Sequence, residues 1–511
     1  MTENKSQLSM QPVYITSAVN YTNGPPHIGH AYEAISTDVI ARYHRSVGRP
    51  VYFLTGTDEH GQKIAKTAKD LGLTPQQLCD KNSDLFKDMD KKLNISYDNF
   101  IRTTDEKHKK IAQKVFEKIY ENGDIYLGEY TGWYNSREER FVTETEASST
   151  NYVDPVSNLK YEKISESSYF FKLENYRQRL IKHIMNDANF IFDEAHRNDI
   201  LKRLQDPLRD LSISRTSFDW GIPVQINGQT QDKHVMYVWF DALTNYLSGQ
   251  HNDEKENNLV WNSYGQPIHI IGQDIIWFHA VIWPCILIAI GCPLPKSIII
   301  HGFINDDENR KMSKSLGNVV DPTDLLQQYN SDIIRYYLIR GGVYGSDFKF
   351  SPIYLKEKTN SELADCYGNL VSRVFALIKS KCLSTVPNTP TNESVFDSSL
   401  ISQIDNYFHN GQISHALEII IQMVRSINLW LTEKAPWNSK DASQVDLILR
   451  QALEKIYIVT HFLYPFIPSS CQVVFDHYNH PKKYLTELSN YNLCPNKIID
   501  CSKFILFEKL K

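Results

Sequence analysis

The chain has 511 residues, of which 41% are hydrophobic and 23% charged, and its formal net charge is −5 at pH 7. This length is too great for one compact core, so we expect roughly two to four domains of a soluble, globular protein rather than a disordered or fibrous one. The slightly acidic balance excludes a uniformly basic nucleic-acid-binding protein, and any contact with RNA must use a local basic surface.

Cysteine usage and hydropathy indicate the cellular compartment in which the protein is expected. Eight cysteines are spread along the chain without a CxxC pair, which signals neither a disulfide framework nor a thiolate zinc site. The N-terminal sequence MTENKSQLSMQP has neither an apolar signal core nor an arginine-rich leader. The most apolar stretch, 275–290, contains His279 and Pro284 and is shorter than the roughly 18 residues of a membrane span. We interpret it as a helix buried against a sheet, and we expect a cytoplasmic protein without membrane contact.

The first part of the chain predicts a strand, a helix and a second strand. Residues 13–19 (VYITSAV) are rich in β-branched side chains, and NGPP at 23–26 is turn chemistry before a helix start. A helix is expected over about 28–47, ended by GRP at 48–50, and VYFLTG at 51–56 is the next strand. Two strands around one helix predict a parallel βαβ unit with a ligand site at the strand ends.

The pattern changes twice further along the chain. Residues 123–233 hold many aromatics and short polar runs, which indicates an inserted domain. Strands are expected again at 267–272 (PIHIIG) and 297–303 (SIIIHGF), on either side of the apolar helix. From about residue 356 onward the apolar positions follow three-and-four spacing, which predicts a helical bundle.

The first motif that suggests chemistry is PPHIGH at 25–30, at the exit of the first expected strand. Unpaired N–H groups and a partial positive charge at a helix N-terminus suit a phosphate. His27 and His30 can share one helix face, and Gly29 lets a nucleotide lie against the backbone. Imidazole donors there could stabilise charge developing at an α-phosphate. Taken alone, the motif is equally compatible with a turn that carries two solvated histidines.

The second motif is KMSKS at 311–315, which follows the last expected strand and is flanked by Gly302 and Gly317. Lys311 and Lys314 on a loop could reach the β- and γ-phosphates and neutralise a departing pyrophosphate. A solvated basic loop is the commoner explanation for such a pentapeptide by itself. The two motifs in this order, both expected at one end of a parallel sheet, resemble the signature of class I aminoacyl-tRNA synthetases.

Longer segments narrow the resemblance to the methionyl-tRNA synthetase family, over almost the whole chain. They are GTDEHGQKI (56–64), LSISRTSFDWGIPV (211–224), YVWFDALTNYL (237–247), IIGQDIIWFHAVIWP (270–284) and KMSKSLGNVVDP (311–322). This resemblance implies an enzyme that forms methionyl-adenylate and pyrophosphate from methionine and ATP with Mg²⁺, and then transfers methionine to tRNA(Met). It implies His27, His30, Lys311 and Lys314 as catalytic residues.

The resemblance also assigns binding residues. An apolar, aromatic-lined slot suits a thioether, and Asp58, just after a strand, could pair with the substrate ammonium. For any one of the aromatics, and for His279, ordinary core packing is the competing interpretation. The residues implied for methionine are Ala18, Val19, Tyr21, Asp58, Trp239, Ala242, Leu243, Tyr246, Ile275, Phe278 and His279. Those implied for ATP are His27, Gly29, His30, Gly272, Asp274, Lys311 and Lys314, with Asp274 at the ribose hydroxyls.

In the expected bundle, GNLVSR (368–373) and EKAPW (433–437) resemble the family's anticodon-reading elements. They imply that Asn369 and Arg373 hydrogen-bond to anticodon bases and that Trp437 stacks on one. The alternative is a capping asparagine and a surface arginine.

Two departures from the family pattern affect the expectations. Many members carry a cysteine-built zinc knuckle, but residues 132–146 contain neither cysteine nor histidine, so the chain is similar to the zinc-free branch and no structural zinc is expected. Residues 339–342 read IRGG instead of the usual arginine–glutamate pair, which could loosen a local hinge. Because the sequence ends soon after the bundle, a monomer is expected.

The expected fold class is α/β, a Rossmann-like parallel-sheet catalytic domain followed by an all-α anticodon-binding bundle. The expected divisions are 1–122 and 234–300 for the two catalytic halves, 123–233 for the inserted connective domain, 301–355 for the KMSKS connector and 356–511 for the bundle. A class I enzyme for leucine, valine or cysteine and an RNA-binding protein without catalysis remain as alternatives. The short insertion and missing cysteine ligands weigh against the first, and the intact histidines and lysines of both motifs weigh against the second.

Overall fold

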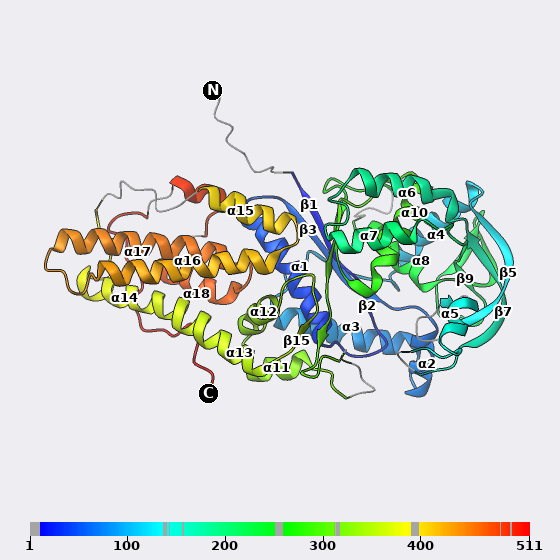
Figure 1. Cartoon of the computed structure of the whole chain (residues 1–511), viewed down its shortest axis with the longest axis horizontal. Helices are drawn as coiled ribbons and strands as arrows, with labels where there is room; N and C mark the ends of the chain where they lie inside the picture. The colour runs from blue at the N-terminus through cyan, green and yellow to red at the C-terminus, as the bar shows by residue number, and fades with distance from the viewer. Residues whose placement is uncertain are drawn as a thin grey trace, which may run out of the picture.

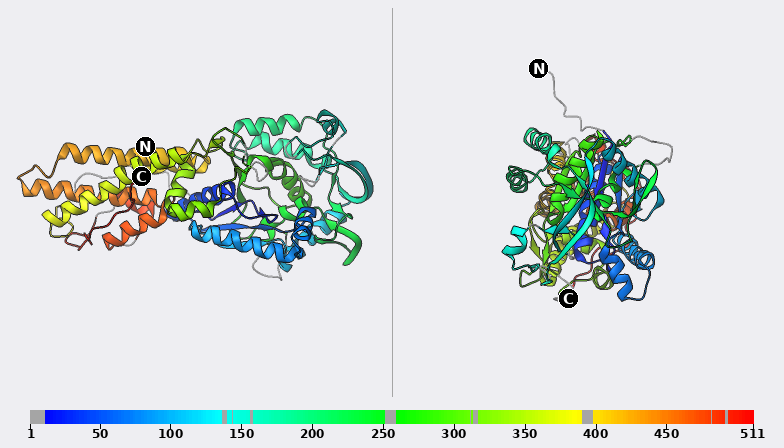
Figure 2. Two further views of the ribbon diagram at one scale, coloured as in Figure 1. Left: turned by 90° about the horizontal axis from the view of Figure 1, so that it is seen from below. Right: turned by 90° about the vertical axis from the view of Figure 1, so that its right-hand side faces the viewer.

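The protein consists of an α/β half and a helical half that lie end to end along its longest axis (Figure 1). A view from below shows the helices of the second half running away from the sheet (Figure 2). The computed structural model describes residues 11–135, 140–142, 144–155, 158–250, 259–310, 312, 317–389, 398–480, 482–490 and 493–511.

The α/β half is built on a six-stranded parallel sheet, which confirms the predicted Rossmann-like fold class. The strand order is β13-β12-β1-β3-β2, with β4 beside β3. Long runs of apolar residues in these strands suit a sheet that is buried on both faces. The strands and the helix that joins the first two are β1 (Val13–Ser17), β2 (Asn20–Tyr21), α1 (Ile28–Ser46), β3 (Val51–Asp58), β4 (Asn99–Arg102), β12 (Pro267–Gly272) and β13 (Ser297–His301).

Two hydrophobic cores cover the two faces of the sheet. Ile15 and Phe53 belong to a core that continues through α1 into the helical half, whereas their neighbours Tyr14 and Leu54 belong to a core beneath the inserted strands. This alternation follows from the two-residue period of a strand. Helix α1 is therefore packed against both halves of the molecule. The helices between β3 and the inserted strands are α2 (Gln62–Asp70), α3 (Pro75–Lys92) and α4 (Glu106–Glu121).

After α4 the chain forms two antiparallel sheets, at the end of the molecule away from the helical half (Figure 1). Asn227 and Gly228 have φ angles of 54° and 69°, and the flanking residues pair directly, as a two-residue hairpin turn requires. The elements are β5 (Ile125–Asn135), β6 (Arg140–Val142), α5 (Glu144–Ser149), β7 (Glu162–Phe171), α6 (Glu174–Asn186), α7 (Glu194–Arg203), β8 (Leu211–Ser212), β9 (Ser214–Arg215), β10 (Pro223–Ile226) and β11 (Gln229–Met236).

The apolar stretch after β12 is buried, as predicted, but it is not one regular helix. It forms a 3-10 turn η1 (Gln273–Ile275), a π-helical turn η2 (Phe278–Ile282) and α10 (Trp283–Ile290). The Trp283 amide donates to the Phe278 carbonyl, five residues back, and Pro284 has no amide to donate four residues back. The sequence analysis noted Pro284, but the π-helical turn that this proline favours was not predicted. Helices α8 (Val238–Leu243) and α9 (Asn245–Ser248) precede β12.

The helical half confirms the predicted C-terminal helical region. The Ile413, Ala416 and Ile420 side chains, at three-and-four spacing, are fully buried. No helix in the described part of the chain is long and apolar enough to cross a membrane. The remaining elements are β14 (Ile304–Asn305), α11 (Pro322–Gln328), α12 (Ser331–Arg340), β15 (Phe348–Lys349), α13 (Pro352–Lys358), the π-helical segment η4 (Thr359–Gly368), α14 (Asn369–Lys381), α15 (Ser398–His409), α16 (Ile413–Lys434), α17 (Ala442–Leu463), α18 (Pro468–Tyr478) and η5 (Leu485–Asn490).

Candidate active site

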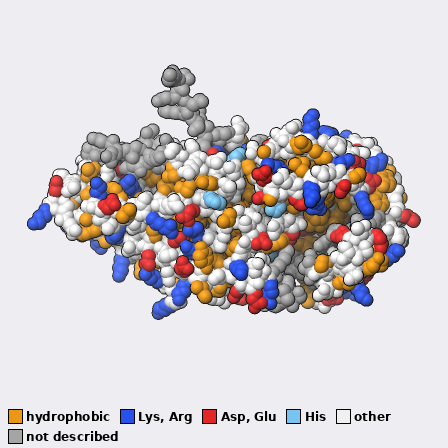
Figure 3. Space-filling model, in the orientation of Figure 1, with side chains coloured by type: hydrophobic (Ala, Val, Ile, Leu, Met, Phe, Trp, Pro, Cys, Tyr) orange, Lys and Arg blue, Asp and Glu red, His pale blue; other side chains and the backbone are white. Residues whose placement is uncertain are grey.

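A cavity of about 900 Å³ lies in the α/β half, where the surface is hollowed and lined with apolar side chains (Figure 3). Its walls come from the ends of β1 and β3, from α8 and α9, and from η1 and η2. The cavity brings together all eleven residues that the resemblance assigned to methionine, which are Ala18, Val19, Tyr21, Asp58, Trp239, Ala242, Leu243, Tyr246, Ile275, Phe278 and His279.

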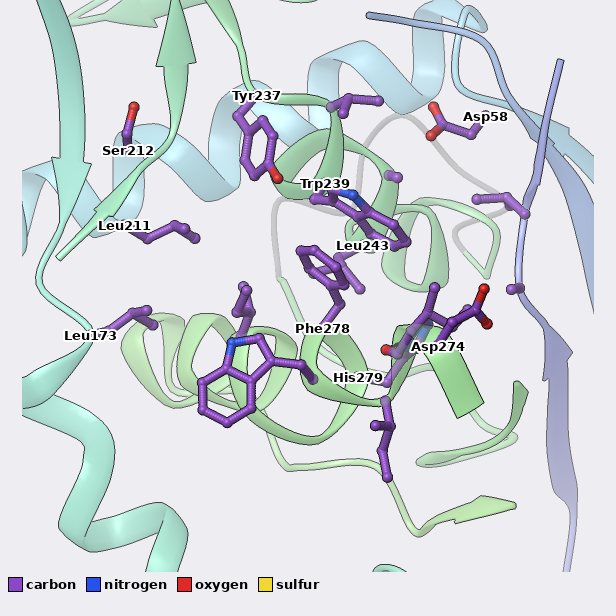
Figure 4. A pocket seen from close by; sticks show the side chains of 18 of the residues that line it. Asp58, Leu173, Leu211, Ser212, Tyr237, Trp239, Leu243, Asp274, Phe278 and His279 are labelled. Atoms are coloured by element: carbon purple, nitrogen blue, oxygen red, sulfur yellow. Dashed lines mark hydrogen bonds between the residues drawn. The ribbon is translucent and has the colours of Figure 1, made fainter. Parts of the chain in front are cut away.

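An aromatic pair divides this cavity. The Trp239 and Phe278 rings are stacked, with centroids 3.8 Å apart and planes 8° apart. Asp58 and Asp274 lie on one side of the pair, and Leu211 of the inserted strands lies on the other (Figure 4). One compartment therefore faces the carboxyl ends of the parallel strands, and the second faces the inserted sheet. We call the first compartment the slot.

A neutral histidine forms the floor of the slot. His279 Nδ1 lies 3.0 Å from the Ile275 carbonyl oxygen, which can only accept, so Nδ1 carries a proton. Burial lowers the pKa of His279 to about 4, so Nε2 is unprotonated at neutral pH and accepts from the Tyr246 hydroxyl at 2.7 Å. The slot floor thus offers hydrogen-bonded but uncharged groups to a ligand.

Behind Tyr246 lies a second buried histidine, His269 of β12, which the sequence analysis did not single out. Its Nδ1 is 2.7 Å from Thr16 Oγ1 of β1, and its ring centroid is 4.2 Å from that of Tyr246. Burial lowers the pKa of His269 well below its usual value. The only polar side chain in the strand PIHIIG was the available signal for it.

A carboxylate between two histidines anchors α8. Asp241 accepts from His60 Nδ1 and from His108 Nε2, each at 2.6 Å, and all three side chains are buried. Desolvation opposes the charge of Asp241, but the two imidazoles outweigh it and lower the pKa of this carboxyl. His60 follows β3 and His108 lies on α4, so the cluster fixes the helix that carries Trp239 against two other elements.

The two histidines of PPHIGH lie together at the start of α1. Their rings stack with centroids 3.7 Å apart, and Gly29 allows this because a Cβ there would lie 3.0 Å from the His27 ring. The Gly29 amide donates to His27 Nδ1, and the His27 amide donates to His30 Nδ1, both at 3.1 Å. In the neutral rings this leaves the proton on Nε2, so both rings are N–H donors. Neither histidine lines the cavity.

A carboxylate–histidine pair connects the strand ends near the slot. Glu33 of α1 accepts from the Ala18 amide at 2.8 Å and from His301 Nε2 at 3.0 Å. His301 Nδ1 lies 2.9 Å from the Gly302 carbonyl oxygen, so both ring nitrogens face acceptors. Desolvation opposes protonation of His301, but Glu33 outweighs it and raises the pKa of His301. The sequence analysis missed this pair.

Beside this pair, the β12 end brings together two residues predicted for ATP. Asp274 lines the cavity, and a Cβ on Gly272 would lie 2.8 Å from Asp274 Oδ1 and 3.5 Å from the His301 ring. Because Gly272 has no Cβ, the Asp274 carboxylate has room to lie against it.

Lys311 and Lys314 lie outside the described residues, but the segments on either side of them are described and are joined to each other. Asp306 accepts from Arg310 on one flank and from Asn318 Nδ2 on the other, each at 2.8 Å. After the loop, the Val320 carbonyl accepts from the amide of Ile28 at 3.1 Å. The second flank is thereby joined to the first residue of α1, next to His27.

In the helical half, the structure brings Arg373 and Trp437 together. The guanidinium carbon lies 5.7 Å from the indole centroid, and Arg373 Nη2 donates to Asn428 Oδ1 at 3.3 Å. Asn369 is exposed at the start of α14, one helical turn before Arg373.

The described residues contain no group of three or more histidine, cysteine or carboxylate side chains that could hold a metal ion. Residues 136–139 and 143, within the stretch 132–146 without cysteine or histidine, lie outside the described residues.

Comparisons with known proteins give a consistent result. A family model described as "tRNA synthetases class I (M)" matches residues 13–153 and 142–375. The methionine–tRNA ligase of Brucella suis is 39% identical over 482 residues, covering 92% of each chain, and that of Rhizobium meliloti is 40% identical over 478 residues, covering 91% of each. Mycobacterium tuberculosis methionyl-tRNA synthetase in complex with methionyl-adenylate superposes with a TM-score of 0.89 and 35% identity, covering 97% of this chain and 99% of that one. The chain belongs to the methionyl-tRNA synthetase family of class I synthetases.

Proposed function

We propose that this protein is a methionine–tRNA ligase, which activates methionine with ATP to methionyl-adenylate and then transfers the methionyl group to tRNA(Met). The observation that carries the proposal is an apolar, aromatic-lined slot with a neutral floor at the strand ends, in the same half of the molecule as two stacked histidines at the N-terminus of α1. Family membership and the adenylate complex of the tuberculosis relative support the same reaction.

Methionine would bind in the slot through two kinds of contact. The eleven slot residues suit a soft thioether, since they include the aromatic rings of Trp239 and Phe278 and the uncharged Tyr246–His279 pair. Asp58, at the end of β3, would hold the substrate ammonium as a charge-assisted partner. The same floor disfavours a charged side chain, because the uncharged Tyr246 and His279 would not offset the loss of hydration.

ATP would bind across the strand ends beside the slot. His27 and His30 would donate to the α-phosphate as charge develops, Gly29 and Gly272 would allow close approach, and Asp274 would accept from the ribose hydroxyls. Lys311 and Lys314 would neutralise the pyrophosphate. Mg²⁺ would enter with the triphosphate as part of the substrate, since such sites commonly combine substrate phosphates with few protein ligands.

In the first step, the methionine carboxylate attacks the α-phosphate and pyrophosphate leaves. The enzyme contributes position and charge stabilisation, so no covalent enzyme intermediate is required. In the second step, a terminal ribose hydroxyl of tRNA attacks the adenylate carbonyl and AMP leaves.

The tRNA would be recognised by the helical half. Trp437 would stack on an anticodon base, and Asn369 and Arg373 would hydrogen-bond to base edges. The divisions 1–122, 123–233, 234–300, 301–355 and 356–511 are proposed as the functional parts, and the protein is proposed to act as a cytoplasmic monomer.

The test is ATP–pyrophosphate exchange with each amino acid in turn. We expect exchange with methionine alone, followed by charging of tRNA(Met) transcripts. Exchange with leucine, valine or cysteine instead would identify another class I enzyme. Binding of tRNA without any exchange would identify an RNA-binding protein derived from a synthetase.

A further inference from the structure

A buried arginine lies where three parts of the chain meet. Arg335 of α12 is fully buried, and its Nη2 lies 2.6 Å from Asp38 Oδ2 of α1. It also donates to the carbonyl oxygens of Phe466 (3.1 Å) and Pro465 (2.8 Å), in the turn between α17 and α18, and to that of Leu93 (3.1 Å), after α3. One side chain thus binds the helix that starts at the two histidines, the end of α3 and the base of the helical half.

The partner carboxylate is held from several sides. Asp38 accepts from Arg42 Nε at 2.7 Å, from the Ser96 amide at 2.7 Å and from the Ser96 hydroxyl. Arg42 in turn donates to the Asn94 carbonyl at 2.6 Å and to the Tyr464 hydroxyl at 3.3 Å. Because the Arg335, Asp38 and Arg42 side chains are buried and their hydrogen bonds are directional, the arrangement fixes one relative position of α1 and the helical half.

Helix α12 is tied to the helical half at a second point. The Asp332 carboxylate accepts from the backbone amides of Ser469 and Ser470, in the first turn of α18. A carboxylate at a helix N-terminus is favourable because the amides there lack helical partners. Rotation of α18 about α12 is therefore opposed at two places, at Arg335 and about one turn earlier at Asp332.

We propose that Arg335 is a positioning residue for tRNA aminoacylation. It holds the helical half in one fixed position relative to the catalytic end of α1. This inference rests on the proposed function. Arg335 does not touch any proposed substrate site. It acts through the α17–α18 turn and through Asp38, and it is needed only when one tRNA must reach both ends of the molecule.

The length of α17 makes the position of the far end of the bundle sensitive to small rotations at its base. The connection between α16 and α17, which contains Trp437, lies at the end of the bundle away from the sheet (Figure 1). Helix α17 has 22 residues, and at about 1.5 Å per residue it is about 33 Å long. A tilt of about 5° at its base would move the far end by about 3 Å, and a displacement of about 1 Å of a reacting group can cost about 100-fold in rate.

The first variant is Arg335→Lys. It keeps a cation beside Asp38 but cannot hold three separate carbonyl groups with one planar fork. We expect methionine-dependent pyrophosphate exchange within about twofold of the wild type, because that step needs no tRNA. We expect kcat/KM for full-length tRNA(Met) to fall at least about tenfold, mostly in kcat.

Two further measurements separate positioning from folding. A minihelix that contains only the acceptor stem cannot contact the bundle, so its slow charging should be the same in wild type and variant. The double variant Arg335→Met, Asp38→Asn removes the Arg335–Asp38 ion pair, and the asparagine oxygen can still accept from Arg42, so it should show the same pattern as Arg335→Lys. Ser469→Ala, which removes a contact to Asn94 at the exposed edge of the same interface, is the matched control and should charge full-length tRNA normally.

The results discriminate clearly. Unchanged charging of full-length tRNA in both Arg335 variants overturns the inference. A parallel loss of exchange, minihelix charging and full-length charging also overturns it, because Arg335 would then serve the catalytic half or the fold alone. Absence of exchange in the wild type would instead contradict the proposed function.

Discussion

Two buried histidines in the α/β half have pKa values that are shifted in opposite directions. His279, on the slot floor, faces one acceptor and one donor, and burial lowers its pKa to about 4. His301, at the end of β13, faces two acceptors, and Glu33 raises its pKa. Both side chains are buried, so the partner groups decide the direction in which each pKa is shifted.

The difference fits the chemistry proposed for each region. A thioether carries no charge, so a neutral floor avoids leaving an uncompensated ion beside it. Phosphates and a departing pyrophosphate are anionic, and at the strand ends Glu33 favours the protonated form of His301, while Lys311 and Lys314 follow in the sequence. Removing a group from the second region should impair chemistry, and removing one from the first should impair methionine binding or stability.

The largest effect is expected at the cationic loop. Lys314→Ala should lower methionine-dependent pyrophosphate exchange about 1,000-fold, because one charge proposed to stabilise the leaving group is lost. The fold should stay intact, as judged by circular dichroism. Near-normal exchange in this variant would contradict the role given to KMSKS.

A smaller effect is expected at the slot entrance. Asp58→Asn keeps the shape of the side chain but loses the charge-assisted contact to the ammonium, which is worth about 1.5–3 kcal/mol. The KM for methionine should therefore rise about 10- to 100-fold, with the KM for ATP little changed. Equal increases in both constants would place Asp58 outside the methionine site.

The slot and the strand ends proposed to bind phosphates could be predicted from the sequence to different extents. The motifs around His27 and Lys314 and the parallel sheet were recognisable from local residues, and the eleven slot residues came from the family resemblance. The Glu33–His301 pair and the Asp241 cluster were missed, because their members lie 268, 181 and 133 residues apart and only the folded chain joins them. Arg335 was not singled out from the sequence, since nothing local marks a fully buried arginine.

The pH dependence of the free energy of unfolding should show the effect of the neutral His279. The folded-state pKa of His279 is about 4, below the usual value of about 6.5, so the folded form resists protonation. Its contribution is complete above pH 6.5 and is lost as the pH falls toward 4. At pH 5 the loss is about 2 kcal/mol, and His279→Gln should remove that part of the pH dependence. Urea unfolding at pH 7 and pH 5 measures it, and an identical pH dependence in the variant would refute it.

The smallest effect, and the opposite trend, is expected for Glu33→Gln. Because the folded-state pKa of His301 is raised, its pairing stabilises the protein below the unfolded value of about 6.5, and this contribution is lost as the pH rises through the folded pKa. The glutamine oxygen can still accept from the Ala18 amide, so the substitution removes mainly the charge. The variant should be about 1 kcal/mol less stable at pH 6, and the deficit should shrink as the pH rises. A deficit that grew with pH would mean that His301 is neutral, and the contrast between the two histidines would fail.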